Sequence, residues 1–212
     1  ITLAYSQEVE LDCINTTKVT SKFINLEKSS TVIWSEDFGN GFPNGWSRGT
    51  INTAGGIATC NWVWSTDGSW GFWNSNSGNS ADSAIQSTTS NNGFLISDID
   101  SANHYTYGQP SGSTYEYIDS YFITSAINTL GYPNINLEFE QNFRLNNGID
   151  LIVSISSDSI SWTDFFVKGN ASNNQESPNP ELVSLNISCV AGDQPNVYIK
   201  VGWTARVYYW MI

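Results

Sequence analysis

The strongest constraint on the fold is an alternation of apolar and polar residues in the second half of the chain. In residues 135–140 every odd position is apolar and every even position is polar. Successive side chains of a β-strand point to opposite faces, so this pattern predicts a strand with one buried and one exposed face. The pattern recurs at Leu151, Val153 and Ile155; at Val183, Leu185, Ile187 and Cys189; and at Val197, Ile199, Val201 and Trp203.

Turn-forming segments separate these strands, and helical periodicity is almost absent. Turns are expected at residues 146–148, 157–159 and 192–195, which contain Asn, Gly, Ser, Asp and Pro. Short strands with turns between them are typical of a two-sheet antiparallel β-sandwich of jelly-roll type. We therefore predict an all-β fold with these side chains in its core: Leu137, Phe139, Leu151, Val153, Ile199 and Val201.

The first half of the chain is less regular. Residues 31–38 are typical of a strand, and residues 39–46 are typical of a tight turn that holds two aromatic residues. Residues 61–101 are rich in Trp, Gly, Ser and Asn, with a short strand candidate at 93–96, and residues 103–117 predict a Tyr-rich loop. No repeat of fixed period is visible, which argues against a propeller or solenoid.

The chain has 212 residues, a length that fits one β-sandwich. We place the sandwich at residues 31–212 and interpret residues 7–30 as an N-terminal leader or linker. Residues 1–6 have two interpretations, because Ala4-Tyr5-Ser6 resembles the end of a signal peptide, whereas the alternative is a short first strand. The sequence stops inside an apolar run, and we expect the sandwich to be truncated at its C-terminal end.

The charge balance excludes some partners. The net charge is −12, with 8 basic and 20 acidic residues, whereas nucleic acids and anionic membranes attract basic surfaces. No apolar stretch reaches the roughly 18 residues that span a bilayer, so membrane insertion is not expected. Charged residues make up only 13%, about half the usual share, and this composition favours a secreted or cell-surface β protein. Acidic surfaces also suit calcium.

The three cysteines are far apart in the sequence. Cys13, Cys60 and Cys189 show no CxxC spacing of the kind found in zinc or redox sites. One disulfide with a free thiol and three buried thiols are equally consistent with the sequence.

Four groups of short motifs follow one another along the chain. They are Ile33-Trp34-Ser35-Glu36-Asp37-Phe38 with Gly41-Phe42-Pro43 and Gly45-Trp46; residues 119–125; residues 153–158 followed by Ser161-Trp162-Thr163; and residues 196–203 with 208–212. In this order the motifs resemble the MAM-like and cleaved-adhesin-type domains of large secreted bacterial proteins, and the resemblance covers about 180 residues.

The resemblance implies a jelly-roll sandwich, a non-catalytic role, a structural calcium ion and export by the type IX secretion route. It points most directly to Asp37 as a calcium ligand and less directly to Glu36. Carboxylates at a strand end can converge with turn carbonyls on one ion. The complete set of metal candidates is Glu36, Asp37, Asp98, Asp100 and Asp119. Asp98 and Asp100 are chosen on spacing alone, and an exposed turn explains them equally well.

A cluster of aromatic residues is a candidate ligand-binding platform. Trp62, Trp64, Trp70 and Trp73, with Phe72, lie in a Gly-, Ser- and Asn-rich stretch. Planar rings stack on the apolar faces of sugars, while neighbouring Asn and Asp side chains bind hydroxyls. The alternative is that these rings fill the core and hold long loops in place.

Catalytic motifs are absent from the sequence. His104 is the single histidine, and neither G-x-S-x-G nor HExxH is present. Glu138 and Glu140 alternate on a polar strand face, as any exposed strand shows, although paired carboxylates also hydrolyse glycosides. We expect no enzyme activity. The leading hypothesis is an extracellular adhesion or recognition module that binds a glycan or a surface protein. The alternative is a carbohydrate-binding module accessory to a secreted hydrolase.

Overall fold

The structure is a computed structural model that describes residues 1–5, 31–53, 55–73, 82–106 and 115–212. The predicted leader or linker at 7–30 lies outside the described residues. The strands are β1 (Thr2–Tyr5), β2 (Thr31–Ser35), β3 (Ser47–Asn52), β4 (Val63–Ser65), β5 (Phe94–Asp98), β6 (Ile118–Ile123), β7 (Ile135–Leu145), β8 (Leu151–Ser156), β9 (Thr163–Lys168), β10 (Gln175–Glu176), β11 (Glu181–Asn186), β12 (Tyr198–Ala205) and β13 (Tyr209–Met211).

Helical segments are short. They are α1 (Ile99–Ser101), α2 (Ser188–Ala191), a 3-10 turn (Ser90–Asn92) and a π-helical turn (Ala102–Thr106). The π-helical turn occupies the start of the predicted Tyr-rich loop.

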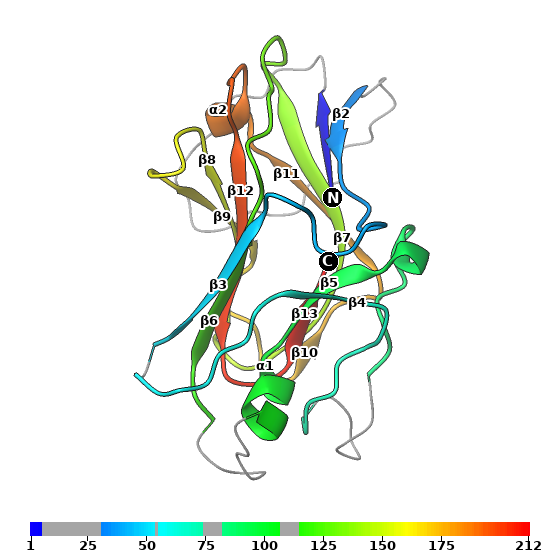
Figure 1. Ribbon diagram of the computed structural model, residues 1–212, viewed down its shortest axis with the longest axis vertical. Coiled ribbons are helices and arrows are strands. Elements are labelled where there is room, and N and C mark those ends of the chain that lie inside the picture. Colours follow the sequence, from blue (N-terminus) through cyan, green and yellow to red (C-terminus); the bar gives the residue numbers. More distant parts are fainter. Residues whose placement is uncertain (6–30, 54, 74–81, 107–114) are drawn as a thin grey trace.

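The strands form two antiparallel sheets that face each other, which confirms the predicted β-sandwich (Figure 1). The five-stranded sheet has the order β3-β6-β12-β8-β9, and the eight-stranded sheet has the order β2-β1-β7-β13-β5-β4, with β10 and β11 also paired to β7. From β5 onward the chain crosses repeatedly between the sheets: β5, β7, β11 and β13 belong to one, and β6, β8 and β12 to the other. Such crossing is the jelly-roll form of the sandwich.

The core lies between the two sheets and follows the predicted parity. The six side chains expected to face inward are buried, with at most 4% exposed. Strand β7 departs from simple alternation beyond Glu140, where Asn142 and Arg144 are also buried. Arg144 is paired with Tyr209 of β13 and with Glu176 of β10, so strands cover both edges of β7 here.

A buried polar chain links the two sheets. The indole Nε1 of Trp203 on β12 donates to Oγ of Ser97 on β5 at 2.9 Å, and Oγ of Ser97 lies 3.0 Å from Oγ of Ser120 on β6. Buried polar atoms need such partners, because an unsatisfied donor or acceptor costs about 1–3 kcal/mol. The network therefore joins β5 of one sheet to β6 and β12 of the other.

The segment Glu36–Trp46 builds an aromatic corner of the core. Phe38 has a positive φ of 61° and is buried against Trp46 in an edge-to-face contact. Trp46 also stacks on Phe122 of β6, with ring centroids 5.3 Å apart. The turn at residues 39–46 thus carries its two aromatic residues, Phe42 and Trp46, back onto the sandwich, where their rings make an edge-to-face contact.

Two sequence expectations end differently in the structure, and a third segment follows one of its two interpretations. The strand expected at 31–38 ends at Ser35. The alternation through Ile187 and Cys189 does not continue as strand, because β11 ends at Asn186 and the chain turns into α2. Thr2–Tyr5 form β1 between β2 and β7, in line with the alternative that this segment is a first strand.

The cysteines differ in state. Cys189 is disulfide-bonded, whereas Cys60 is a free thiol in the core. Burial raises the pKa of Cys60 to about 12, so it is an unreactive thiol at neutral pH. Of the two sequence interpretations, one disulfide with a free thiol fits this arrangement, and three free thiols do not.

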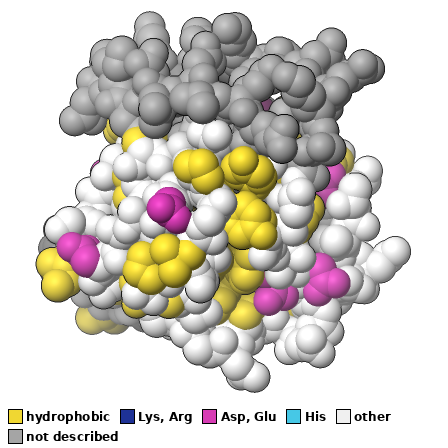
Figure 2. All heavy atoms as spheres, turned by 90° about the horizontal axis from the view of Figure 1, so that it is seen from above, with side chains coloured by type: hydrophobic (Ala, Val, Ile, Leu, Met, Phe, Trp, Pro, Cys, Tyr) yellow, Lys and Arg dark blue, Asp and Glu magenta, His cyan; other side chains and the backbone are white. Residues whose placement is uncertain are grey.

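The acidic composition is visible on the surface. On the end of the molecule in Figure 2, the described residues show acidic and hydrophobic side chains and no Lys or Arg. Within the described part of the chain, no helix is long and apolar enough to cross a membrane.

Candidate ligand-binding groove on the five-stranded sheet

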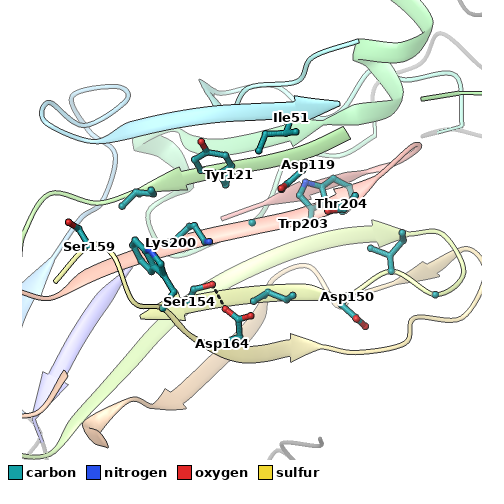
Figure 3. Close-up of a pocket in the computed structure, with 16 residues that line it drawn as sticks. Ile51, Asp119, Tyr121, Asp150, Ser154, Ser159, Asp164, Lys200, Trp203 and Thr204 are labelled. Carbon is teal, nitrogen blue, oxygen red and sulfur yellow. Dashed lines mark hydrogen bonds between the residues drawn. The ribbon is translucent and has the colours of Figure 1, made fainter. Parts of the chain in front are cut away.

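A groove of about 580 Å³ lies on the outer face of the five-stranded sheet (Figure 3). All five strands, with the turn between β8 and β9, contribute residues to its lining. The inward-facing side chains of β12 (Ile199, Val201 and Trp203) are buried in the core. The alternate residues Lys200, Gly202 and Thr204 therefore face the groove.

Two glycines, one on the edge strand β3 and one on β12, flank Tyr121 on this face of the sheet. Tyr121 of β6 pairs with Gly49 of β3 on one side and with Gly202 of β12 on the other. A Cβ atom added at Gly49 would lie 2.5 Å from the Tyr121 hydroxyl, so the ring lies over Gly49. Glycines inside strands allow such close approaches. Because neither neighbour has a side chain, the half-buried Tyr121 ring can lean over β3, and it forms part of the groove lining.

Two further rows of paired residues border Tyr121. One row contains Ile51, Asp119 and Thr204. The other row contains Ser47, Ile123, Lys200, Ser154 and Asp164. Paired residues in a sheet point to the same face, so both rows present their side chains alongside the tyrosine.

Of the three groove carboxylates, Asp119 is the one for which neither oxygen accepts a hydrogen bond from the described residues. It is half-buried. Burial raises the pKa of Asp119, and the charge of Lys200 partly offsets that rise. By contrast, Oδ1 of Asp164 accepts a hydrogen bond from Oγ of Ser154 at 2.6 Å, and Oδ1 of Asp150 accepts one from the backbone N–H of Asn170 at 2.6 Å.

Lys200 and Trp162 form the cationic side of the groove. The ammonium of Lys200 lies 5.1 Å from the ring centroid of Trp162, within the range of a cation–π interaction. Such an interaction holds the long lysine side chain in place and leaves its N–H groups able to donate. Figure 3 shows Lys200 directed along the same surface as Ser154.

The β8–β9 turn positions Trp162. Oδ1 of Asp158 accepts hydrogen bonds from the backbone N–H groups of Ile160 and Ser161, at 2.8 and 2.7 Å. Oγ of Ser156 also donates to Oδ1 of Asp158, at 2.9 Å. Together these hydrogen bonds lower the pKa of Asp158 to about 2. A carboxylate that satisfies successive N–H groups fixes the turn. The sequence motif V-S-I-S-S-D followed by S-W therefore has a structural reason, since Asp158 holds the loop that carries Trp162.

The predicted metal ligands lie at three separate places in the structure, which are Glu36 with Asp37, Asp98 with Asp100, and Asp119. Among the described residues, no three His, Cys, Asp or Glu side chains gather closely enough to hold a metal ion. Glu36 accepts a hydrogen bond from the N–H of Phe38, and Asp37 accepts bonds from the N–H of Gly39 and from Nδ2 of Asn92. Calcium binding at this strand end remains a prediction.

Asp98 and Asp100 hold the Trp-rich loop. Oδ2 of Asp98 accepts a hydrogen bond from the N–H of Trp70 at 2.6 Å, and the fully buried Asp100 accepts one from the N–H of Trp73. Oδ1 of Asp98 also accepts from the N–H of Ser101 in α1. These two carboxylates therefore position a loop, and Asp119 belongs to the groove on the other sheet.

The predicted tryptophan platform divides into a core residue and surface residues. Trp62 is fully buried and packs edge-to-face on Phe122 and Trp210, a place from which its ring cannot contact a surface ligand. Trp64, Trp70 and Trp73 are 40–48% exposed. Trp64 also donates from Nε1 to the carbonyl of Phe38 at 3.0 Å, so its ring is held against the neighbouring turn.

The residues that the sequence analysis considered for catalysis contact neighbouring side chains and backbone. The ring of His104 lies 5.3 Å from that of Phe72, and Nδ1 lies 3.4 Å from the Tyr115 hydroxyl. Glu138 accepts a hydrogen bond from Ser184, and Glu140 accepts two from Thr88.

The sequence interpretation missed the groove residues Tyr121, Trp162 and Lys200. One signal was available, because Gly49 and Gly202 stand inside strand-like segments, where glycine is unfavourable unless something approaches closely. Their shared contact with Tyr121 depends on which strands pair, and the sequence does not show that.

No protein-family model and no curated protein matches the sequence. Two cleaved adhesin domains of Lys-gingipain from Porphyromonas gingivalis are similar solved structures, each with 15% identity. For one the TM-score is 0.40, with 83% of this chain and 92% of that chain covered. For the other it is 0.42, with 84% and 94% covered.

A third solved structure is the carbohydrate-binding module TmCBM61 in complex with β-1,4-galactotriose. It is 8% identical, with a TM-score of 0.34, and 79% of this chain and 83% of that chain are covered. All three similarities are distant, and the fold described above rests on the strand pairing of this chain itself. The MAM-like part of the sequence resemblance has no counterpart among these three structures.

Proposed function

We propose that this chain is a non-catalytic extracellular recognition module that binds a carbohydrate in the groove of the five-stranded sheet. The observation that carries the proposal is the placement of Tyr121. Its ring lies over Gly49 and beside Gly202, in a hollow that also contains the open carboxylate of Asp119.

This combination suits a sugar. A pyranose ring has an apolar face of C–H groups and an edge of hydroxyls, so it needs a flat aromatic surface next to polar side chains. Binding sites in general combine apolar lining with a few placed polar groups. Tyr121 supplies the flat surface, while Asp119 and Lys200 supply an acceptor and a donor within the same groove.

The extracellular assignment is supported by chemistry of the chain. Disulfides persist in oxidising compartments, and Cys189 is disulfide-bonded. The low share of charged residues and the Asn- and Ser-rich loops fit the same environment. The module would attach a larger secreted or cell-surface protein to a glycan, and type IX export remains an expectation from the sequence resemblance.

The test is binding of the purified chain to a panel of oligosaccharides, followed by titration calorimetry on the best ligand. We expect Tyr121→Ala to lower the affinity by about tenfold or more, equivalent to roughly 1.4 kcal/mol. We expect Tyr121→Phe, which keeps the ring, to lower it much less. Failure of every glycan to bind the wild type would refute the proposal.

The Trp-rich loop is a second candidate surface, because Trp70 and Trp73 are exposed while the half-buried Asp98 and the buried Asp100 hold their backbone. Trp70→Ala and Trp73→Ala, in the loop between β4 and β5, serve as matched variants. If these variants abolish glycan binding and Tyr121→Ala does not, the ligand site is the loop and the groove assignment is wrong.

A further inference from the structure

The groove that we propose as the glycan site is lined by an unequal set of charges. Three carboxylates, from Asp119, Asp150 and Asp164, and one ammonium, from Lys200, belong to its lining. The chain as a whole carries a net charge of −12. A ligand that enters the groove therefore meets a negative local field.

The hydrogen bonds that these groups already accept restrict the class of ligand further. Asp164 and Asp150 already accept bonds from Ser154 and from the Asn170 N–H, whereas Asp119 accepts none from the described residues. An ionised carboxylate can only accept, so Asp119 calls for a ligand donor. Its half-buried position makes that need stronger, because an unpaired polar group is costly away from water.

A neutral hydroxyl can donate to Asp119 and adds no negative charge to the groove. Hydroxyls donate and accept, so one sugar edge can donate to Asp119 and accept from Lys200. A uronate or sulfate group is acceptor-only and negative. It could pair with Lys200, but it would also stand among the three carboxylates, and uncompensated like charges at short range are repulsive.

From this geometry we infer that the groove is selective for uncharged, hydroxyl-rich glycans and discriminates against acidic ones, with Asp119 as the residue that sets the selectivity. The inference rests on the proposed glycan-binding function and deepens it by naming the ligand class. Asp119 acts twice, as the acceptor of a sugar hydroxyl and as the charge that repels an acidic group.

The experiment compares neutral hexose trimers with the uronic-acid trimers of the same linkage, titrated into the wild type, Asp119→Asn and Glu138→Gln. The amide of Asp119→Asn keeps an acceptor oxygen and removes the charge. Glu138→Gln makes the same change on the outer face of β7, in the other sheet. We expect the wild type to bind the neutral trimer at least about tenfold more tightly. Asp119→Asn should lower that ratio about fivefold, and Glu138→Gln should leave it within about twofold.

Salt provides a test without any variant. The wild-type preference should shrink as salt rises from low concentration to about 0.5 M, because screening weakens repulsion. Tight binding of neutral and acidic trimers alike, or a preference unchanged in both Asp119→Asn and high salt, overturns the inference while the proposed function stands. Absence of binding to any trimer or other glycan overturns both together.

Discussion

A Cβ atom added to Gly202 would lie 3.1 Å from Cβ of Tyr121, the residue paired with Gly202 on β6. The hollow above the five-stranded sheet therefore depends on a missing side chain as much as on the residues present. Gly202 has extended backbone geometry, so a larger residue there is limited by space in the groove and not by the conformation of the chain.

This relationship predicts the effect of filling the groove. Gly202→Val should reduce glycan affinity by at least about tenfold, because its branched side chain occupies the space beside Tyr121. The free energy of unfolding should change by about 1 kcal/mol or less, since β-branched residues are favourable in strands. Calorimetry with urea unfolding checks both. Ser184→Val, at an exposed position of β11, is the control, and undiminished binding by Gly202→Val would contradict the location of the site.

Trp62 should behave as a core residue. Its side chain is fully buried between Phe122 and Trp210, so Trp62→Ala should lower the free energy of unfolding by about 3–5 kcal/mol. Trp70→Ala, at a position that is 48% exposed, should lower it by less than about 1 kcal/mol. Equal costs for the two substitutions, measured by urea unfolding, would show that the buried packing described for Trp62 is incorrect.

Asp82 should make stability depend on pH. Its Oδ2 lies 3.7 Å from the guanidinium of Arg144. Burial nevertheless raises the pKa of Asp82 from 3.8 to about 6, with Glu176 and Asp98 adding to the rise. The folded protein thus binds this proton more tightly than the unfolded chain does. The stabilisation from Asp82 is full below pH 3.8 and is lost as pH rises through about 6.

The amide side chain that Asp82→Asn introduces is uncharged at every pH. The substitution should therefore remove this loss of stability. Relative to the wild type, the variant should gain free energy of unfolding steadily between pH 4 and pH 7. Urea unfolding of both proteins at each pH measures the difference. A difference that stays constant, or that shrinks as pH rises, is incompatible with the raised pKa.

Calcium should stabilise the domain through Glu36 and Asp37. A ligand that binds only the native state at a hundredfold excess over its dissociation constant adds about 2.7 kcal/mol. We expect calcium to raise the melting temperature relative to a chelator, and Asp37→Asn to weaken that response. Identical melting temperatures with calcium and with chelator would remove this prediction.

No turnover is expected when the chain is screened against peptides, esters and polysaccharides. Two of the three groove carboxylates already hold protein donors, whereas a glycosidase needs an acid and a base or nucleophile set across the scissile bond. Asp119 is the residue to examine if hydrolysis appears, since its pKa is raised. Hydrolysis that disappears in Asp119→Asn would replace the recognition module with an enzyme.

The alternation of apolar and polar residues predicted much of the fold. It showed which side chains of β7, β8 and β12 face the core, because successive residues of a strand point to opposite sides and burial of the apolar side is favourable. The same reasoning failed at Ile187 and Cys189. An apolar residue at an even spacing is equally compatible with a buried turn, and α2 begins there.

What the sequence by itself determined is the class of fold, the parity of its strands and the acidic character of its surface. Only the tertiary structure decided that Asp98 and Asp100 hold the Trp-rich loop, that Trp62 is in the core, and that Gly49, Tyr121 and Gly202 share one row. The physical reason is that strand order and register are set by the packing of the whole sandwich. Residues 72 and 81 positions from Tyr121 become its neighbours only when β3, β6 and β12 pair.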